Sequence, residues 1–384
     1  MRTAHLSAPL VLLIAAILIV QGCAAQKSKQ EQQSAPPTQT QAAKKQAWES
    51  EWEKAVIEAQ RERKVVIATG QVTSVREALF QSFKNRYNIE IEFIVGSGQE
   101  LSNRIATQRK AGIFAFDLMM TGNTTLVQVL KPQGVFQPLL PQLLLPDVRD
   151  TQNWYENKIQ FVDKDGQVLF IVLSPSPNLF ANSNLVTKDE ISSYRDILAP
   201  RYSGKIVMAD PTVPGTGQEY IFLTIKSYGV EYLRELAKQN PVILRNDRLQ
   251  VEWIAQGKYL VGLGGSPLAQ EFIKDAAPIF FPNITEGQST LGVGFGGLAL
   301  FDQTPHPQAA KVFINWLFSR EGQLVYSKSD QRQSVRVDVP ADHLPSFNIR
   351  KPGITYIKSS SEENLPVRDQ NLKTAKEVLG HLLR

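Results

Sequence analysis

Apolar residues in the first half of the chain alternate between short continuous runs and longer stretches with helical spacing. The run "KVVIATG" (residues 64–70) is β-branched and ends at a glycine, which predicts a buried strand. In residues 73–88, Val75, Leu79 and Phe83 recur at the spacing of one helix face. The runs "IEIEFIVGSG" and "AFDLMMTG" are strand-like too, and a helical segment follows each of them. Three repeats of strand, glycine turn and helix predict parallel strands with helical crossovers.

The second half of the chain repeats the pattern with different spacing. "SGKIVMADP" and "YLVGLGGSP" are strand-like runs that lead into helical segments, and "QSTLGVGFGGLALF" is a glycine-rich strand before the helix that starts near residue 307. Between the halves, residues 166–184 indicate a strand that crosses from one unit to the other. We therefore expect an α/β protein with two lobes, each a mixed sheet flanked by helices.

Three of the predicted helices begin with a hydroxyl residue and a glutamate three positions later. These pairs are Ser74 with Glu77, Ser97 with Glu100, and Thr216 with Glu219. A hydroxyl and a carboxylate at this spacing are typical of a capping box, in which each side chain accepts a hydrogen bond from the other residue's backbone N–H. The sequence predicts a capping box at all three positions.

The N-terminal segment has the outline of an export signal. Arg2 precedes an apolar run over residues 8–20, which is shorter than a membrane-spanning helix needs. The residues from Val20 to Cys23 resemble a bacterial lipobox, which implies cleavage after residue 22 and a lipid on Cys23. An ordinary signal peptide that happens to contain a cysteine is the alternative. Residues 23–46 lack bulky apolar side chains, so we interpret them as the lipidated cysteine and a disordered tether.

Composition narrows the class of protein. Residues 47–384 are long enough for two domains, and a single cysteine in an exported chain leaves no internal disulfide. The formal net charge of +5 is a mild excess of basic residues, and the sequence contains no stripe of basic residues interleaved with aromatic ones. Nucleic acid is therefore not an expected partner.

The turns after five predicted strands are rich in glycine and hydroxyl residues. At the carboxyl ends of parallel strands such turns bring backbone N–H groups and helix N-termini close to a ligand. Helix capping alone would favour the same residues at any one turn, but turns from two facing lobes would converge on one cleft. The candidate ligand-binding residues are Thr69, Gly70, Ser97, Gly98, Thr121, Gly122, Gly215, Thr216, Gly265 and Ser266.

Catalytic motifs do not explain the sequence. "GVGFGG" lies inside a strand-like run without the helix and acidic residue of a dinucleotide site, and neither a G-x-S-x-G elbow nor a GxxxxGK[ST] loop occurs. The few histidines lie in the signal segment, beside prolines or in the C-terminal tail. We expect no catalytic residues, no metal ligands and no cofactor, although an exported hydrolase stays an alternative.

Several segments resemble a known family. "EAQRERKVVIATG", "GSGQELSNRI", "DILAPRYSGKIVMADPTVPGTG" and above all "HPQAAKVFINWLFSREGQ" look like the periplasmic substrate-binding proteins of ABC importers, in the type 2 branch that contains iron(III)-binding proteins. The resemblance implies two lobes that close around a solute, which a permease then receives. The lobes would comprise residues 47–168 plus 292–345 and residues 169–291 plus 346–384. It also implies a monomer in the periplasm or on the outer face of the cell membrane.

One departure from that family concerns the ligand. Its iron(III) binders carry two adjacent tyrosines where this chain has "GLGGSP", and Tyr155, Tyr202 and Tyr220 are scattered. Small glycine and hydroxyl turns suit a ligand held by N–H and O–H donors, so we expect a small anion, a phosphonate or sulfonate, or a zwitterion. Iron(III) is the alternative within the family, and a solute-sensing module without transport is the alternative from another class.

Overall fold

A computed structural model describes residues 46–383, except residues 214, 265, 286–287 and 293–295. Residues 45–384 form one compact unit, and the description below concerns this body alone. The predicted signal peptide (residues 1–22), Cys23 and nearly all of the tether lie outside the described residues. In the part of the chain that is described, no helix is both long and apolar enough to cross a membrane.

The first sheet has the strand order β2-β1-β3-β13-β4, with β5 also paired to β13. β1 runs parallel to β2 and β3, as predicted, whereas β13 is antiparallel to its three neighbours. The strands are β1 (Lys64–Thr69), β2 (Glu90–Val95), β3 (Leu118–Thr121), β4 (Phe136–Gln137), β5 (Val168–Phe170) and β13 (Gly297–Phe301).

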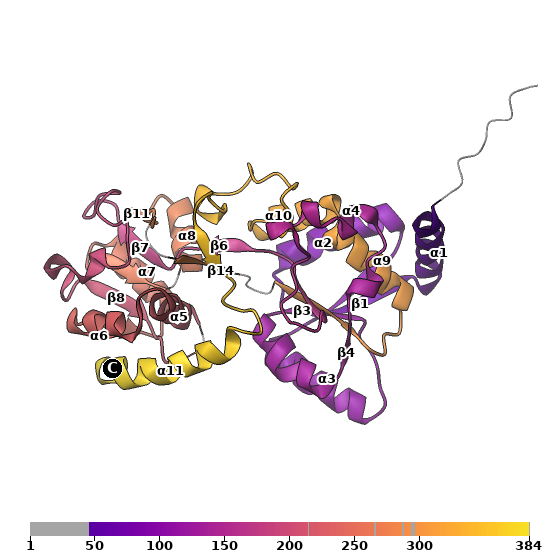
Figure 1. Ribbon diagram of the computed structural model, residues 1–384, viewed down its shortest axis with the longest axis horizontal. Coiled ribbons are helices and arrows are strands. Elements are labelled where there is room, and N and C mark those ends of the chain that lie inside the picture. The colour runs from indigo at the N-terminus through magenta and orange to yellow at the C-terminus, as the bar shows by residue number, and fades with distance from the viewer. Residues whose placement is uncertain (1–45, 214, 265, 286–287, 293–295, 384) are drawn as a thin grey trace, which may run out of the picture. The chain divides into compact units, whose positions relative to one another are not determined.

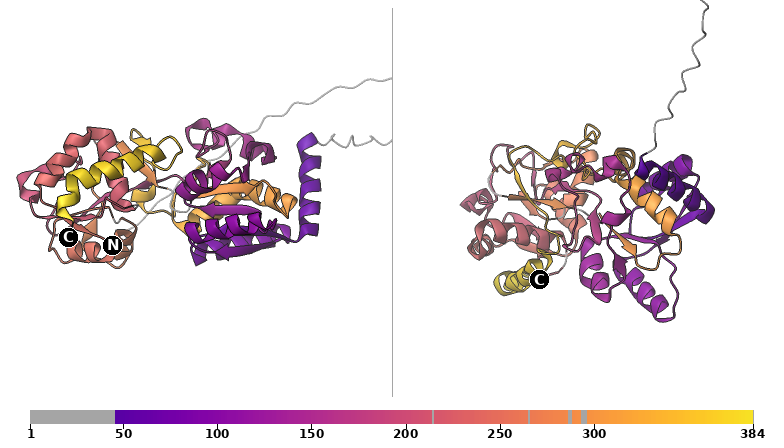
Figure 2. Two further views of the ribbon diagram at one scale, coloured as in Figure 1. Left: turned by 90° about the horizontal axis from the view of Figure 1, so that it is seen from below. Right: turned by 45° about the vertical axis from the view of Figure 1, so that its right-hand side comes forward.

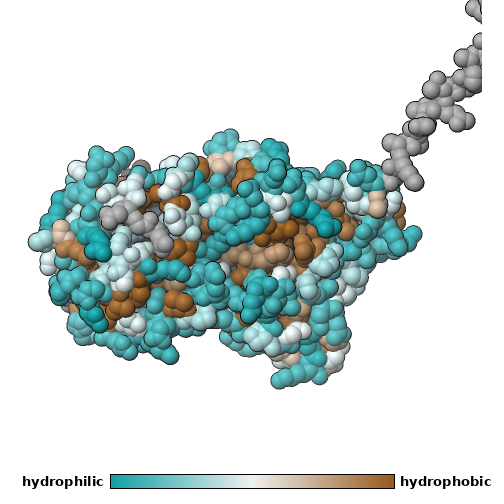
Figure 3. Space-filling view, viewed as in Figure 1, coloured by the Kyte–Doolittle hydropathy of each residue, from teal (hydrophilic) through white to brown (hydrophobic). Residues whose placement is uncertain are grey.

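Helices cover this sheet through the apolar positions that the periodicity indicates. Val75, Leu79 and Phe83 are fully buried, and the Phe83 ring lies 5.3 Å from the rings of both Phe313 and Trp316. Figure 3 shows hydrophilic residues over most of this face and hydrophobic residues gathered between the helices, over β1 and β3. The helices of this group are α1 (Ala47–Glu62), α2 (Thr73–Tyr87), α3 (Gly98–Lys110), α4 (Pro146–Arg149), α9 (Pro307–Phe318) and α10 (Arg320–Asp330).

The second sheet has the order β11-β7-β10-β8-β9, and Figure 1 shows α5 to α8 gathered around it. β8 is parallel to β9 and β10, whereas β7 is antiparallel to β10 and β11. The strands are β7 (Leu179–Asn182), β8 (Ile206–Ala209), β9 (Val242–Leu244), β10 (Val261–Leu263) and β11 (Ile279–Phe280). The helices are α5 (Thr216–Tyr228), α6 (Val230–Lys238), α7 (Asp247–Ala255) and α8 (Ser266–Lys274).

A third, three-stranded sheet links the two larger ones. Its order is β14-β12-β6, with β6 at Ser174–Ser176, β12 at Gln288–Gly292 and β14 at Thr355–Ile357. The crossing strand predicted over residues 166–184 is thus three short strands, since β5, β6 and β7 belong to three different sheets. Of these three strands, β5 lies in the first sheet. The predicted lobe limits, residues 47–168 plus 292–345 and residues 169–291 plus 346–384, stay a proposal.

The C-terminal helix α11 (Leu365–Leu379) packs on the second group of helices, as its amphipathic pattern suggests. It contacts α5 and α6, and Ala375 and Leu379 belong to the same buried cluster as Tyr220 and Leu233. Figure 2 shows α11, in yellow, lying along these helices. The chain therefore returns to the second sheet after α9 and α10 have completed the first.

Of the three predicted capping boxes, one is confirmed. The Ser97 hydroxyl accepts a hydrogen bond from the Glu100 N–H at 3.2 Å, and the Ser97 N–H donates to Glu100 Oε2 at 2.8 Å. The predictions at Ser74 and Thr216 are wrong, because α2 already begins at Thr73 and the residue before α5 is Gly215. Thr216 is consequently a first-turn residue whose hydroxyl is not committed to capping.

Candidate ligand-binding site

A cavity of about 650 Å³ is lined by residues that lie in or next to each of the three sheets. Its wall includes the turn after β3, the N-terminal turn of α5, strand β6, the end of α10, and α11 together with the segment before it. The main lining residues, in that order, are Gly122, Asn123, Thr124, Gly215, Thr216, Glu219, Ser174, Ser176, Asp330, Arg332, Ser359, Ser360 and Arg368.

The described lining is polar and carries charges of both signs. Its acidic side chains are Glu219, Glu271 and Asp330, and its basic side chains are Arg332 and Arg368. Hydroxyl residues supply most of the remaining polar groups. Such a wall offers hydrogen-bond donors as well as acceptors, so it suits a solute that has both.

Four buried polar atoms of this wall have no hydrogen-bond partner among the described residues. Three are acceptors, namely Asn123 Oδ1, Thr216 Oγ1 and Glu219 Oε1, and one is a donor, Arg368 Nε. Buried polar groups are nearly always paired, because an unmade hydrogen bond costs about 1–3 kcal/mol. These atoms have almost no accessible surface, so a ligand or water would reach them only after their side chains turn toward the cavity.

Asp330 and Arg332 face each other at the end of α10. Arg332 Nε lies 3.8 Å from Asp330 Oδ2, which is an ion pair without a short hydrogen bond. Burial raises the pKa of Asp330 to about 6, against a smaller opposing effect of Arg332. Its carboxylate is ionised at neutral pH and becomes neutral in mild acid, which changes the charge of the cavity wall.

Three of the predicted residues line this cavity: Gly122, Gly215 and Thr216. Gly265 lies outside the described residues, and of Ser266 only the backbone, at the start of α8, is described.

The other predicted residues do not line this cavity where the structure describes their side chains. The buried Thr69 hydroxyl donates to the Met120 carbonyl at 2.9 Å, and Ser97 caps α3. A Cβ at Gly98 would lie 2.4 Å from Thr125 Oγ1, so this glycine allows close packing of its turn. Thr121 is buried at the end of β3, and Gly70 is half-buried after β1.

The sequence did not single out Asn123, Arg332 and Arg368 as cavity residues, and it singled out Glu219 only as part of a capping box. Asn123 follows the predicted glycine turn directly, so the turn itself was a usable signal. No local sequence signal pointed to Arg368, because it reaches the cavity from a helix that follows Glu219 by about 150 residues.

The tyrosines named as candidates serve other roles. Tyr220 is buried against the Tyr232 hydroxyl, and Tyr202 donates to Glu190 Oε1 at 2.7 Å. The Arg350 guanidinium lies 4.6 Å from the centre of the Tyr155 ring. None of the described residues that line the cavity is a tyrosine. In the described part of the chain, no three His, Cys, Asp or Glu side chains cluster as a metal site would require.

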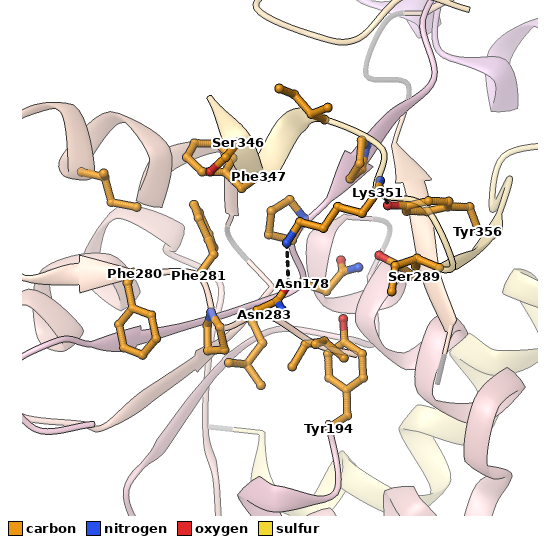
Figure 4. A pocket seen from close by; sticks show the side chains of 18 of the residues that line it. Asn178, Tyr194, Phe280, Phe281, Asn283, Ser289, Ser346, Phe347, Lys351 and Tyr356 are labelled. Carbon is orange, nitrogen blue, oxygen red and sulfur yellow. Dashed lines mark hydrogen bonds between the residues drawn. The ribbon is translucent and has the colours of Figure 1, made fainter. Parts of the chain in front are cut away.

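A second cavity, of about 260 Å³, lies beside β6, β11 and β14. Figure 4 shows Phe280, Phe281 and Phe347 on its wall and the hydrogen bond from Lys351 to Asn283 near its mouth. The described lining of this cavity contains none of the buried polar atoms that lack a partner. The larger cavity is therefore the better candidate for a polar solute.

Comparisons with known proteins agree with this two-lobed arrangement. A family model described as bacterial extracellular solute-binding protein matches residues 78–347. Iron uptake protein A2 of Synechocystis sp. is 21% identical over 285 residues, which cover 69% of this chain and 76% of that protein.

Two solved structures illustrate the fold. Trichodesmium IdiA (FutA), in complex with iron and citrate ligands, has a TM-score of 0.64 at 20% identity and covers 82% of this chain and 99% of its own. AfuA from Actinobacillus pleuropneumoniae, with exogenous fructose-6-phosphate bound, has a TM-score of 0.56 at 16% identity and covers 83% and 98%. At these identities the likeness shows the fold alone, and it confirms the predicted two-lobed α/β class. Because the family model covers more than half of its length, the chain belongs to the bacterial extracellular solute-binding proteins.

Proposed function

We propose that the protein is the solute receptor of a bacterial ABC importer and that its solute binds in the 650 Å³ cavity. The observation that carries this proposal is the polar lining of that cavity, with charges of both signs, contributed by the turn after β3, α5, the end of α10 and α11. A cavity of this volume is typical of small-molecule sites. Residues next to both larger sheets line the wall, so closure of the lobes would enclose the solute before a permease receives it.

The lining favours a small polar solute with charges of both signs. Arg368 and Arg332 suit an acidic group such as a carboxylate, phosphonate or sulfonate, while Glu219 and Asp330 suit an ammonium group. A small anion, as expected from the glycine turns alone, would meet these carboxylates without compensation. The mixed charges therefore point to the zwitterion among the expected ligand classes.

Iron(III) is the second candidate, and the names of the relatives favour it. The Synechocystis relative is an iron uptake protein, and the Trichodesmium structure holds iron and citrate. A ferric ion with an organic acid would also bring negative oxygens to Arg368 and positive charge to Glu219. The absence of tyrosine from the described lining counts against a bare ferric ion held by phenolates.

We further propose that the protein is exported, carries a lipid on Cys23, acts without catalysis and works as a monomer. Membership of an extracellular family supports export. A tether of residues 23–46 would let the body reach a permease in the same membrane. A solute-sensing module without transport would bind the same ligand but would form no complex with a permease.

Thermal unfolding of the body, residues 47–384, tests the proposal. The panel comprises aminoethylphosphonate, taurine, amino acids, sulfate, phosphate and ferric citrate, each at a saturating concentration. A ligand at 100 times its dissociation constant adds about 2.7 kcal/mol to the free energy of unfolding, which shifts the midpoint visibly.

The matched variants are Thr124→Trp, which fills the cavity from an exposed position, and Thr107→Trp, on an exposed face of α3 away from it. We expect a shift that Thr107→Trp keeps and Thr124→Trp loses. A shift that both variants keep would place the ligand elsewhere, and no shift with any compound would contradict the receptor assignment.

A further inference from the structure

The C-terminal helix lies beyond the segment that the family model matches, yet it reaches the cavity. The match ends at residue 347, and α11 begins at Leu365. α11 packs along α5 (Figures 1 and 2), whose first turns carry Thr216 and Glu219. Arg368 Nη2 lies 3.6 Å from Glu219 Oε2. A segment outside the residues that the family model matches therefore supplies a charged group of the proposed site.

Arg368 is held in place by one buried side chain. Gln218 is 4% exposed, and its Nε2 donates to the Arg368 carbonyl at 3.2 Å. Its Oε1 accepts from Arg368 Nη2 at 3.1 Å. Because Gln218 bonds both the backbone and the guanidinium of Arg368, it fixes the orientation of the guanidinium against α5.

The pair of Arg368 and Glu219 leaves part of its hydrogen-bonding capacity unused. Arg368 Nη2 lies 3.6 Å from Glu219 Oε2, which is beyond hydrogen-bond distance, and the two side chains are only 15% and 13% exposed. Arg368 Nε and Glu219 Oε1 have no partner among the described residues. Two side chains of opposite charge thus lie side by side, without a short hydrogen bond between them, on residues that line one cavity.

Thr216 and Asn123 line the same cavity as this pair. Thr216 lies one helical turn before Glu219, so the two side chains share a face of α5, and Thr216 Oγ1 has no described partner. Asn123 is 2% exposed, and its Oδ1 is likewise unpaired although its Nδ2 donates to Ser360 Oγ at 3.0 Å. Asn123 Oδ1 lies against Gly297, so Thr216 is the hydroxyl residue best placed to bind an ammonium group together with Glu219.

We propose that Arg368 and Glu219 form a specificity pair for an amphoteric solute, with Arg368 binding its acidic group and Glu219, with Thr216, binding its ammonium group. This inference rests on the proposed receptor function and names its ligand class. A solute with only one of the two charges leaves the other buried charge unpaired, which penalises it. The pair therefore selects by charge pattern, and the C-terminal helix sets that selection.

Calorimetric titration of the body with aminoethylphosphonate and two truncated probes tests the pair. Ethylphosphonate lacks the ammonium group, and ethanolamine lacks the acidic group. The variants are Arg368→Gln, Arg368→Lys and Glu219→Gln, with Arg234→Gln as control, because Arg234 is an exposed residue of α6 that pairs with Glu231. Unfolding without ligand, measured for each variant, checks that it folds.

We expect aminoethylphosphonate to bind the wild type more tightly than either truncated probe. Arg368→Gln and Glu219→Gln each weaken that binding about tenfold or more, and Arg368→Lys weakens it less because it keeps the charge but loses the fork. Glu219→Gln also narrows the gap between aminoethylphosphonate and ethylphosphonate, which a purely structural role would not do.

Two results would overturn the inference. One is unchanged binding in folded Arg368→Gln. The other is a wild type that binds sulfate, phosphate or ferric citrate but not aminoethylphosphonate, taurine or any amino acid; the receptor function would then stand while the specificity pair would fall. If no compound of the panel binds, the receptor function fails together with the pair.

Discussion

Replacing Lys131 with methionine should destabilise the body, because this lysine is the shared counter-ion of three converging carboxylates. Lys131 Nζ lies 2.9 Å from Asp163, 2.7 Å from Asp165 and 2.7 Å from Glu362. Its side chain is 11% exposed, and that of Asp163 is fully buried. Methionine keeps the length of the side chain and removes the charge, so the variant leaves like charges together without a counter-ion.

The expected loss follows from the environment of Asp163 and Glu362. Removing one partner of a buried ion pair costs about 3–5 kcal/mol. Asp163 keeps hydrogen bonds from the backbone N–H groups of Gln167 and Val168, at 3.0 and 2.9 Å, which reduces the cost. We therefore expect the free energy of unfolding to fall by about 3 kcal/mol, at the lower end of that range.

Urea unfolding at pH 7 measures this loss, with Lys164→Met as control because Lys164 is exposed in the same region. Burial raises the pKa of Glu362, but hydrogen bonds from Lys131 and the Lys164 N–H outweigh burial, so its pKa lies below the ordinary value. That stabilisation is present above the unfolded pKa and is lost as pH falls through the folded one. The gap between wild type and Lys131→Met should therefore shrink in acid. A loss no larger than that of Lys164→Met at pH 7 would refute the reasoning.

Further predictions concern Asp330, Gly217 and Cys23. Burial raises the folded pKa of Asp330 to about 6, while the unfolded group ionises near 3.8. The free energy of unfolding should therefore fall by about 3 kcal/mol as pH rises through this window. Asp330→Asn should flatten this pH dependence in urea unfolding, and an unchanged slope would contradict the prediction. Gly217→Ala places a Cβ 2.3 Å from the Ala209 carbonyl oxygen and should lower the free energy of unfolding by about 1–3 kcal/mol. Gly380→Ala, whose Cβ would lie in open space, should lower it little. Equal losses in the two variants would contradict the clash. Cys23→Ser should move the full-length protein from the membrane fraction to the soluble fraction, and retention in the membrane would contradict lipidation.

The sequence predicted those parts of the fold that depend on neighbours along the chain. Val75, Leu79 and Phe83 share one face because of helical geometry alone, so their burial followed from spacing. The long crossing strand was wrong because an apolar run does not reveal where pairing partners change, and β5, β6 and β7 pair with strands from distant segments.

The candidate site was harder to predict, for two physical reasons. Thr216 and Glu219 matched the spacing of a capping box. Because α5 begins one residue earlier than that pattern requires, Thr216 lies inside the first turn, and both residues line the cavity. Arg368 approaches Gln218 and Glu219 from 150 residues away, and no local pattern encodes that approach. The glycine turn at Gly122 was informative because its position at a strand end limits where it can lie.

Small-angle X-ray scattering of the body, with and without the panel compound that most raises the unfolding midpoint, tests the central claim most directly. The claim is that a solute binds in the cavity lined from both lobes and draws the lobes together. We predict a smaller radius of gyration for the wild type at saturation and no change for Thr124→Trp at the same concentration. An unchanged radius for the saturated wild type, or an equal decrease in both proteins, would contradict the account.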